Sequence, residues 1–271
     1  MTGLLGFRQK PLHPATRRLR FRLLGLLSNR PRNSQRIYVV TVNGQRYKRV
    51  VFPDSYQAAK VAAHLRNFAM TGIYPDVILE RENELWVEYI EGEQVASADA
   101  AVVEKIADLF AVLYSRDPKL VATDRTGFAH ELRRDLEFLN AVGVLGDGVH
   151  GLLQEIAERE TPKDIWIGYD CTDAILKNFV LDPEGRLRGV DVESLNGDQL
   201  IGSGFAKANV RWLGTHSESF LARLREPPVP DFQAYLPFIE MCFVAFWLKS
   251  SFLEKKKRFV DPKLFDRFLG I

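Results

Sequence analysis

The sequence has few cysteines, no long apolar run and no acidic residue among its first 50 positions. Its two cysteines, Cys171 and Cys242, are too few for a disulfide framework, and neither is grouped with histidines at metal-site spacing. A reducing, cytoplasmic setting is therefore expected. No uninterrupted apolar stretch reaches the roughly 18–20 residues that span a bilayer. The most apolar segment, residues 241–248, follows Glu240 and predicts a buried helix.

The missing acidic residues leave the charge unevenly distributed. Residues 1–50 contain 12 of the 37 basic side chains, so the other 221 residues hold 25 basic and all 35 acidic ones. This asymmetry predicts a basic N-terminal arm, residues 1–35, on an acidic body. Arginines mixed with apolar residues at 17–24 suit anionic lipid headgroups, and a solvated face of a first strand or helix is the alternative. Peripheral contact of residues 8–36 with the inner face of an anionic membrane is expected, whereas nucleic acid is not, because nothing resembles an RNA-binding signature.

The first third of the chain has β-rich patterns. Residues 36–52 are two β-rich runs around Asn43-Gly44, the strongest short signal for a hairpin. Asp54 offers a helix N-cap, and the following apolar face predicts a helix at 56–71. Further strands are expected at 77–80 and 84–90. Together these elements predict a small β-rich lobe at residues 36–92.

The remainder, from residue 98, has helical periodicity. Helices are expected at 101–114, 130–142, 149–160, 202–212 and 217–225. Residues 232–253 predict a helix pair or one helix bent at Pro237. Gly202-Ser203-Gly204 has no predicted strand before it and indicates a loop. The pattern as a whole predicts an α+β fold with two lobes, the larger one helical and formed by residues 93–271.

Residues 166–194 carry the densest group of chemically useful side chains: W-I-G-Y-D-C-T-D-A-I-L-K-N-F-V-L-D-P-E-G-R-L-R-G-V-D-V-E-S. A polar loop with Asp173 and Asn178 precedes a predicted hairpin, whose second strand ends at Asp191. Two carboxylates and an amide thus meet at one end of the hairpin. Such oxygen ligands suit Mg²⁺. An ordinary hairpin with acidic ends is the alternative.

This arrangement resembles the catalytic core of the protein-kinase-like fold. The D-V-E that begins at Asp191 resembles its small-molecule branch, which includes aminoglycoside phosphotransferases and sugar and lipopolysaccharide-core kinases. The resemblance implies a bilobal fold that binds ATP and Mg²⁺. It also implies that Asp173 is the catalytic base and that Asn178 and Asp191 hold Mg²⁺.

The same resemblance assigns nucleotide contacts in the first third of the chain. The segment V-E-Y-I-E-G resembles the hinge, so the backbone of Glu88, Tyr89 and Ile90 is expected to meet the adenine. Lys48 is the candidate to hold the phosphates, although matching the preceding aromatic residue shifts the expected position to Val50, about 7 Å along the strand.

Several features depart from the family pattern. The predicted helix at 56–71 contains no acidic residue to pair with the lysine, and His64 or Gln57 would substitute only loosely. Cys171 stands where the loop histidine is expected. No G-x-G-x-x-G precedes the second strand, so the phosphate cover falls to residues 28–35. There, backbone donors at Asn33 and Ser34 and the neighbouring arginines are the candidates.

Three hypotheses follow from the sequence. The first is an ATP-dependent phosphotransferase that acts on a hydroxyl of a small molecule or of a sugar on a lipid or glycan. The second is a catalytically silent kinase-like binding module whose basic arm binds a membrane or an anionic partner. The third is an unrelated α+β protein whose hairpin imitates the motif.

Overall fold

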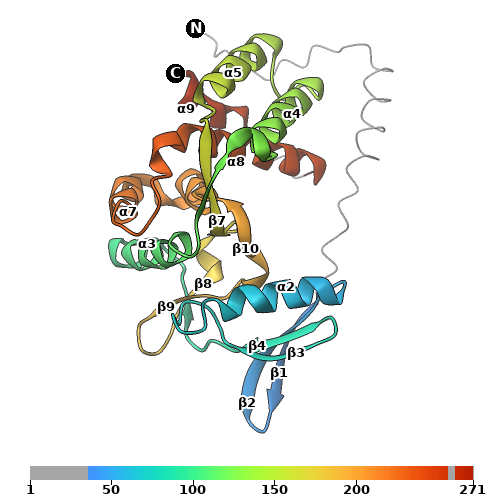
Figure 1. Ribbon diagram of the computed structural model, residues 1–271, viewed down its shortest axis with the longest axis vertical. Coiled ribbons are helices and arrows are strands. Elements are labelled where there is room, and N and C mark those ends of the chain that lie inside the picture. Colours follow the sequence, from blue (N-terminus) through green and yellow to red (C-terminus); the bar gives the residue numbers. More distant parts are fainter. Residues whose placement is uncertain (1–35, 256–259, 271) are drawn as a thin grey trace. The chain divides into compact units, whose positions relative to one another are not determined.

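The computed structural model describes residues 36–255 and 260–270. Strands dominate up to Gln94 and helices dominate afterwards, which is the expected α+β class (Figure 1). The strands are β1 (Arg36–Val42), β2 (Gln45–Val51), β3 (Val77–Arg81), β4 (Glu84–Glu88), β5 (Glu93–Gln94), β6 (Lys119–Ala122), β7 (Asp164–Cys171), β8 (Phe179–Leu181), β9 (Leu187–Gly189) and β10 (Leu195–Leu200). The helices are α2 (Ser55–Arg66), α3 (Ala100–Tyr114), α4 (Phe128–Ala141), α5 (Asp147–Glu160), α6 (Ser203–Ala208), α7 (Ser217–Arg223), α8 (Leu236–Leu253) and α9 (Asp266–Leu269).

The described chain divides into two compact units. One contains residues 36–120 and 166–234, and the other contains residues 121–165, 235–255 and 260–270. Every predicted site residue that the structure describes lies in the first of these, which we call the site unit. The predicted lobes at 36–92 and 93–271 follow the order of the elements rather than this division, and they stay a prediction.

The small sheet of the site unit has the strand order β1-β2-β4-β3, with antiparallel neighbours throughout. Asn43 and Gly44 have φ values of 52° and 81°, so they form the turn between β1 and β2 that their sequence predicts. The core side of the sheet carries fully buried Val50, Leu85 and Val87. The alternation of side chains along each strand therefore leaves β1 mostly exposed.

Helix α2 packs against the small sheet through Ala58, Val61, Ala62 and Leu65. It begins where predicted, because the Asp54 carboxylate accepts a hydrogen bond from the Gln57 N–H at 2.8 Å. Its predicted end at residue 71 was wrong. The helix ends at Arg66 and gives way to tight turns, since the Phe68 N–H donates to the Leu65 carbonyl and the Thr71 hydroxyl donates to Phe68.

Strands β8 and β9 form the predicted hairpin, and β8 also pairs with β5. The Asp182 carboxylate closes the turn by accepting from the Arg186 N–H and Nε, both at 2.8 Å. The second strand ends at Gly189 rather than Asp191, because the Gly189 N–H donates to Ile73 and the Val190 N–H to Asn178. We call residues 166–208 the hairpin region.

Two predictions downstream need correction. A strand, β10, does precede Gly202, and the glycines begin α6 instead of forming a free loop. Residues 236–253 form one helix, α8, with no bend at Pro237, since that proline lies in the first turn, where its missing N–H has no partner to lose. Within residues 36–255 and 260–270, one segment, Gln233–Leu253, could cross a membrane by length and composition, with a mean hydropathy of 1.4. Buried core helices have the same properties, and α8 buries Phe238, Met241 and Val244, as predicted.

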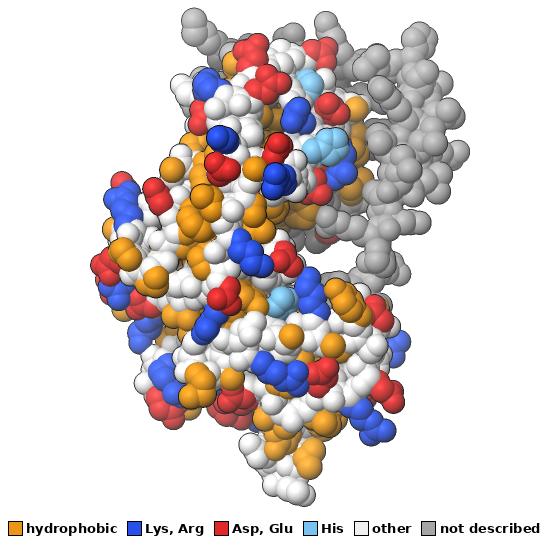
Figure 2. Space-filling view, in the orientation of Figure 1, with side chains coloured by type: hydrophobic (Ala, Val, Ile, Leu, Met, Phe, Trp, Pro, Cys, Tyr) orange, Lys and Arg blue, Asp and Glu red, His pale blue; other side chains and the backbone are white. Residues whose placement is uncertain are grey.

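The described surface carries both signs of charge. On the face shown in Figure 2, Lys and Arg side chains are interspersed with Asp and Glu, with hydrophobic groups between them. The described part of that face therefore shows no broad field of a single sign. The predicted basic arm, residues 1–35, lies outside the described residues.

Candidate functional site

Asp173, Asn178 and Asp191 come together at one end of the hairpin, as the sequence predicts. Asn178 closes a 3-10 turn, Leu176–Asn178, just before β8. Its side-chain amide donates to the Asp173 carbonyl at 2.8 Å, to the Asp173 carboxylate at 3.2 Å and to the Asp191 carboxylate at 3.1 Å. Asn178 thus holds the two carboxylates on either side of one amide.

Glu193, which sequence reasoning missed, lies beside Asp191. It belongs to the 3-10 turn Val192–Ser194 that follows β9. Burial, together with a hydrogen bond and the negative charge of Glu193, raises the pKa of Asp191 to about 7. The Oε1 atom of Glu193 is buried, with no hydrogen-bond partner among the described residues.

These residues fit a hard divalent cation. Two neighbouring carboxylates, one with an unsatisfied buried oxygen, form an environment that a positive ion would stabilise. The described residues contain no group of three or more His, Cys, Asp or Glu side chains that could hold a metal ion by themselves. The candidate donors are instead Asp191, Glu193 and the side-chain oxygen of Asn178, a set that suits Mg²⁺ because this ion keeps phosphate oxygens and water among its ligands.

Lys48 reaches this cluster from β2. Its ammonium donates to the Val190 carbonyl at 2.8 Å and to Glu193 Oε2 at 3.2 Å. Val50, to which the match of the preceding aromatic residue shifts the expected position, is fully buried in the core of the small sheet. Lys48 itself lies at the site, and its carboxylate partner comes from the hairpin region.

Helix α2 supplies no partner for Lys48. It has no acidic residue, as the sequence shows. The two loose substitutes that the sequence suggested are used elsewhere: Gln57 donates to Asp54 at 3.1 Å, and the His64 ring contacts the Tyr169 hydroxyl at 3.2 Å. The carboxylate that contacts Lys48 is therefore Glu193 of the hairpin region.

A second lysine, Lys207, lies at the opposite end of the cluster. It projects from α6 and forms an ion pair with Asp173 Oδ1, and only 8% of its surface is exposed. No signal in the sequence pointed to it, because Lys207 and Asp173 are 34 positions apart. A contact of this separation depends on how α6 is placed.

Asp170 fixes α6 to the strand that precedes the Asp173 loop. Its carboxylate accepts from the N–H groups of Gly202 at 3.2 Å and Gly204 at 3.0 Å, and from the Tyr114 hydroxyl at 3.3 Å. Complete burial raises the pKa of Asp170, and the donors partly offset that rise, which leaves the pKa at about 7. Because its first amides are occupied by Asp170, α6 does not offer them to a ligand.

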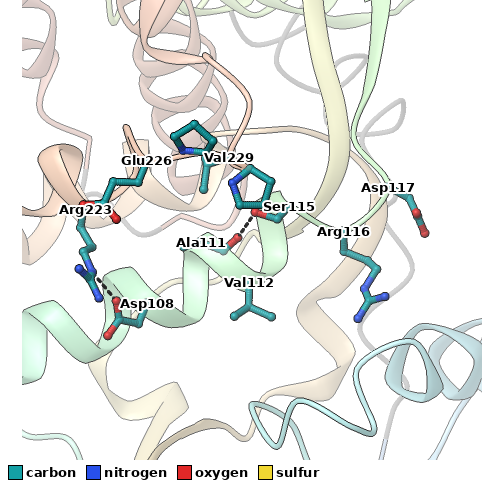
Figure 3. Close-up of a pocket in the computed structure, with 11 residues that line it drawn as sticks. Asp108, Ala111, Val112, Ser115, Arg116, Asp117, Arg223, Glu226 and Val229 are labelled. Carbon is teal, nitrogen blue, oxygen red and sulfur yellow. Dashed lines mark hydrogen bonds and ion pairs between the residues drawn. The ribbon is translucent and has the colours of Figure 1, made fainter.

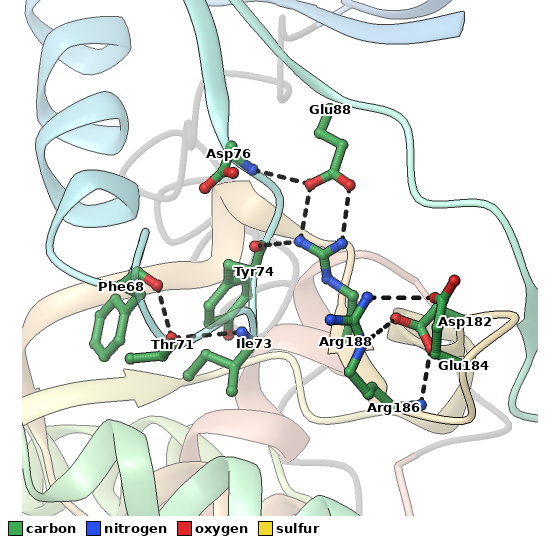
Figure 4. Close-up of polar contacts among 10 residues, drawn as sticks. All are labelled: Phe68, Thr71, Ile73, Tyr74, Asp76, Glu88, Asp182, Glu184, Arg186 and Arg188. Carbon is green, nitrogen blue, oxygen red and sulfur yellow. Dashed lines mark hydrogen bonds and ion pairs between the residues drawn. The ribbon is translucent and has the colours of Figure 1, made fainter.

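The predicted hinge follows β4 and is tied to β9. Arg188 donates to both oxygens of the Glu88 carboxylate, at 2.9 and 2.8 Å, and to the Tyr74 carbonyl at 2.8 Å (Figure 4). The Glu88 N–H already donates to the Asp76 carbonyl at 2.9 Å, so this amide is engaged within the protein. The Tyr89 ring lies 4.4 Å from the Arg46 guanidinium. Contact of Tyr89 and Ile90 with adenine stays a prediction.

Solved structures have the same arrangement of elements. Choline kinase LicA from Streptococcus pneumoniae is similar with a TM-score of 0.57 and 13% identity, covering 93% of this chain and 95% of LicA. An aminoglycoside phosphotransferase from Alicyclobacillus acidocaldarius subsp. acidocaldarius DSM 446 has a TM-score of 0.54 and 16% identity, covering 85% and 83%. LicA in complex with AMP has a TM-score of 0.52 and 13% identity, covering 93% and 94%. The chain has the protein-kinase-like fold. No protein-family model matches its sequence, and no curated protein does.

Two further parts of this kinase-like fold bear on the sequence predictions. Asn33 and Ser34, the predicted phosphate-cover residues, lie outside the described residues. Cys171 occupies the position expected for a histidine, where burial raises the pKa of its thiol to about 12, so it stays protonated. Its sulfur lies 3.6 Å from the Ser194 hydroxyl. Cys171 is therefore a packing residue beneath the Asp173 loop.

A separate cavity of about 420 Å³ lies between the end of α3 and the segment that follows α7 (Figure 3). Asp108 and Arg223 form an ion pair at its edge, and Ser115 donates to the Ala111 carbonyl within it. None of the residues predicted to form the site lines this cavity. It is thus distinct from the cluster around Asn178.

Proposed function

We propose that the protein is an ATP-dependent phosphotransferase that transfers the γ-phosphoryl group to a hydroxyl of a small molecule. The observation that carries this proposal is the chain of polar contacts from Lys48 through Glu193, Asp191 and Asn178 to Asp173. The similar structures support it, because they are a choline kinase and an aminoglycoside phosphotransferase, and one of them contains AMP.

Each residue in this series of polar contacts has a role in the proposed reaction. Lys48 binds the α- and β-phosphates, and Glu193 orients its ammonium. Asp191, Asn178 and Glu193 hold Mg²⁺, which when bound neutralises the charge on the phosphate oxygens. Asp173 accepts the proton of the acceptor hydroxyl, since its carboxylate is partly exposed while Asn178 fixes its position.

Glu193 also bears on the alternative of a catalytically silent module. The missing helix glutamate, the missing loop histidine and the displaced lysine favour it, and the Lys48–Glu193 contact pairs this lysine with a carboxylate from another part of the chain. A glycan- or lipid-linked acceptor and membrane contact by residues 8–36 rest on the sequence alone. The proposal therefore extends to a small-molecule hydroxyl and leaves these finer predictions to experiment.

Thermal unfolding with and without MgATP tests nucleotide binding. A ligand at a hundred times its dissociation constant stabilises by about 2.7 kcal/mol. We expect a Mg²⁺-dependent shift for the wild type and for Asp198→Asn, an exposed carboxylate outside the cluster. Asp191→Asn should lose the Mg²⁺-dependent part. No shift for the wild type at millimolar MgATP would exclude the proposal.

Phosphoryl transfer is tested by ATP turnover in the presence of amino alcohols and aminoglycosides. Asp173→Asn should lower turnover by about 10²–10⁴-fold and leave the affinity for MgATP unchanged, because Asp173 is not among the phosphate-binding residues. Nucleotide binding without any turnover would identify the silent module. Turnover that survives Asp173→Asn would remove this residue from the role of base.

A further inference from the structure

Lys207 is the one residue of the cluster to which the proposed function gives no role. Its ammonium contacts the carboxylate of Asp173, the proposed base, from a side chain that is 8% exposed. Asp173 itself has a side chain that is 42% exposed. The lysine therefore lies beneath the carboxylate, whose accessible side remains available to an acceptor.

Fold stability is a weak explanation for this pair. Burying an ammonium group is costly, and replacing buried ion pairs by apolar residues of similar size is often neutral or stabilising. Helix α6 is already fixed by the hydrogen bonds of Gly202 and Gly204 to Asp170. A charged residue at position 207 is thus not needed to hold the helix, and its contact with Asp173 indicates a chemical role.

Geometry places Lys207 next to the reacting atoms. For proton transfer, the acceptor oxygen must lie within about 3 Å of the Asp173 carboxylate. The phosphorus that this oxygen attacks is the next atom along. An ammonium in contact with the same carboxylate is then a close neighbour of that phosphorus. Lys48 contacts Glu193 at the other end of the cluster, so the two lysines flank the carboxylates.

We propose that Lys207 is a second phosphate-binding lysine, which donates to the transferred phosphoryl group and orients Asp173. This inference rests on the proposed function. In the step itself, the acceptor oxygen forms a bond to the γ-phosphorus as its proton passes to Asp173. The bond from that phosphorus to the β–γ bridging oxygen breaks, and its electron pair leaves with ADP. Lys207 donates hydrogen bonds throughout and gives up no proton.

The test compares the binding of MgADP with the binding of MgADP plus aluminium fluoride, which mimics the phosphoryl group in the transition state of transfer. The variants are Lys207→Met, Lys207→Gln and Lys207→Arg. Lys249→Met is the matched control, since Lys249 forms an ion pair with the buried Asp135 in the other unit. Calorimetry gives the dissociation constants after circular dichroism has shown which variants are folded.

We expect every folded variant to bind MgADP within about threefold of the wild type. Aluminium fluoride should tighten binding to the wild type and to Lys249→Met. Lys207→Met and Lys207→Gln should lose about 10²-fold of that tightening, the usual effect of removing one transition-state donor, and Lys207→Arg should recover part of it. When ATP turnover is measured, the same variants should have a lower kcat and a nearly unchanged KM for ATP.

Undiminished tightening in Lys207→Met or Lys207→Gln would overturn the inference and leave the proposed function intact. A weakened affinity for MgADP alone, with the tightening preserved, would show that Lys207 has a purely structural role and would overturn it too. Failure of the wild type to bind MgADP would remove the proposed function, and this inference with it.

Discussion

The hairpin region and the small sheet contribute to the same cluster in different ways. A Cβ atom added at Gly204 would lie 2.4 Å from Asp170 Oδ1, and one at Gly189 would lie 2.7 Å from the Tyr74 ring. In the small-sheet part, a Cβ at Gly44 or Gly72 would have no atom within 4 Å. The hairpin region is therefore close-packed at Gly189 and Gly204 and open at its Gly185 turn, whereas the small sheet has open turns and an exposed first strand.

This difference determines how each region positions its functional groups. Asp173, Asn178 and Asp191 are held by the backbone and by one another, within 19 residues of sequence. The small sheet contributes one long side chain, Lys48, whose position depends on Glu193 and the Val190 carbonyl. Side chains of the hairpin region are positioned by close packing, whereas the Lys48 side chain is positioned by its contacts with Glu193 and the Val190 carbonyl.

The largest expected effect tests the packing of the hairpin region. Gly204→Ala would place a methyl group against Asp170 Oδ1, the Cys171 carbonyl and the Phe110 ring. We expect it to lower the free energy of unfolding by about 4 kcal/mol, since backbone and buried atoms must move. Urea unfolding measures this. Gly151→Ala in α5, which has open space, should be stabilising by about 0.5–1 kcal/mol. Equal stabilities would show that the region is not close-packed.

The next effect concerns the link between the two regions. Glu88→Gln leaves the Arg188 guanidinium, which is 7% exposed, without its carboxylate. We expect a loss of about 3 kcal/mol, because an unpaired buried charge remains. Arg188→Met should cost less, since it leaves only Glu88, whose side chain is 36% exposed. A larger loss for Arg188→Met in the same unfolding experiment would contradict this order.

Glu193→Gln tests whether the partner of Lys48 has moved from the helix to the hairpin region. Removing this carboxylate should weaken MgATP binding by about 10²-fold, because both the cation and the lysine lose a negative partner. His64→Gln on α2 should change it less than threefold, since His64 contacts Tyr169 instead. Calorimetric titration decides between them. If His64→Gln had the larger effect, the residue of α2 and not Glu193 would support MgATP binding.

The smallest expected effect is a pH dependence at Asp170. Its folded-state pKa, about 7, lies above the ordinary aspartate pKa of 3.8. The folded state thus binds more protons between these values, so stability falls as pH rises through them. From pH 5 to 7 the wild type should lose about 2 kcal/mol relative to Asp170→Asn. A constant difference would mean that Asp170 is ionised throughout this range.

The sequence predicted most accurately where structure and chemistry are local. The Asn43-Gly44 turn, the Asp54 cap and the hairpin at 179–189 each depend on residues a few positions apart, and all were confirmed. The end of α2 and the unbent α8 were mispredicted, because turns after residue 66 and the position of Pro237 within the first turn decide them. The protein-kinase-like fold followed from the order of these elements.

The rest of the candidate site depends on distant contacts. Lys48 and Glu193 are 145 positions apart, and Lys207 and Asp173 are 34 apart. No periodicity or short motif encodes such pairs. The sequence therefore left Lys48 without a predicted partner, because the family pattern places that partner on the neighbouring helix. The three-dimensional arrangement supplies that partner from a turn whose D-V-E pattern was already visible.

Placing Glu193 two residues after Asp191 has a consequence for how this chain can change over evolutionary time. An insertion or deletion within this short turn would displace a proposed cation ligand and the partner of Lys48 together. Helix α2 contributes neither of these residues, so substitutions on its surface can accumulate while the Lys48–Glu193 pair is kept. Distant relatives should therefore be sought by the spacing from Asp173 to Glu193, and α2 is where their sequences should diverge most.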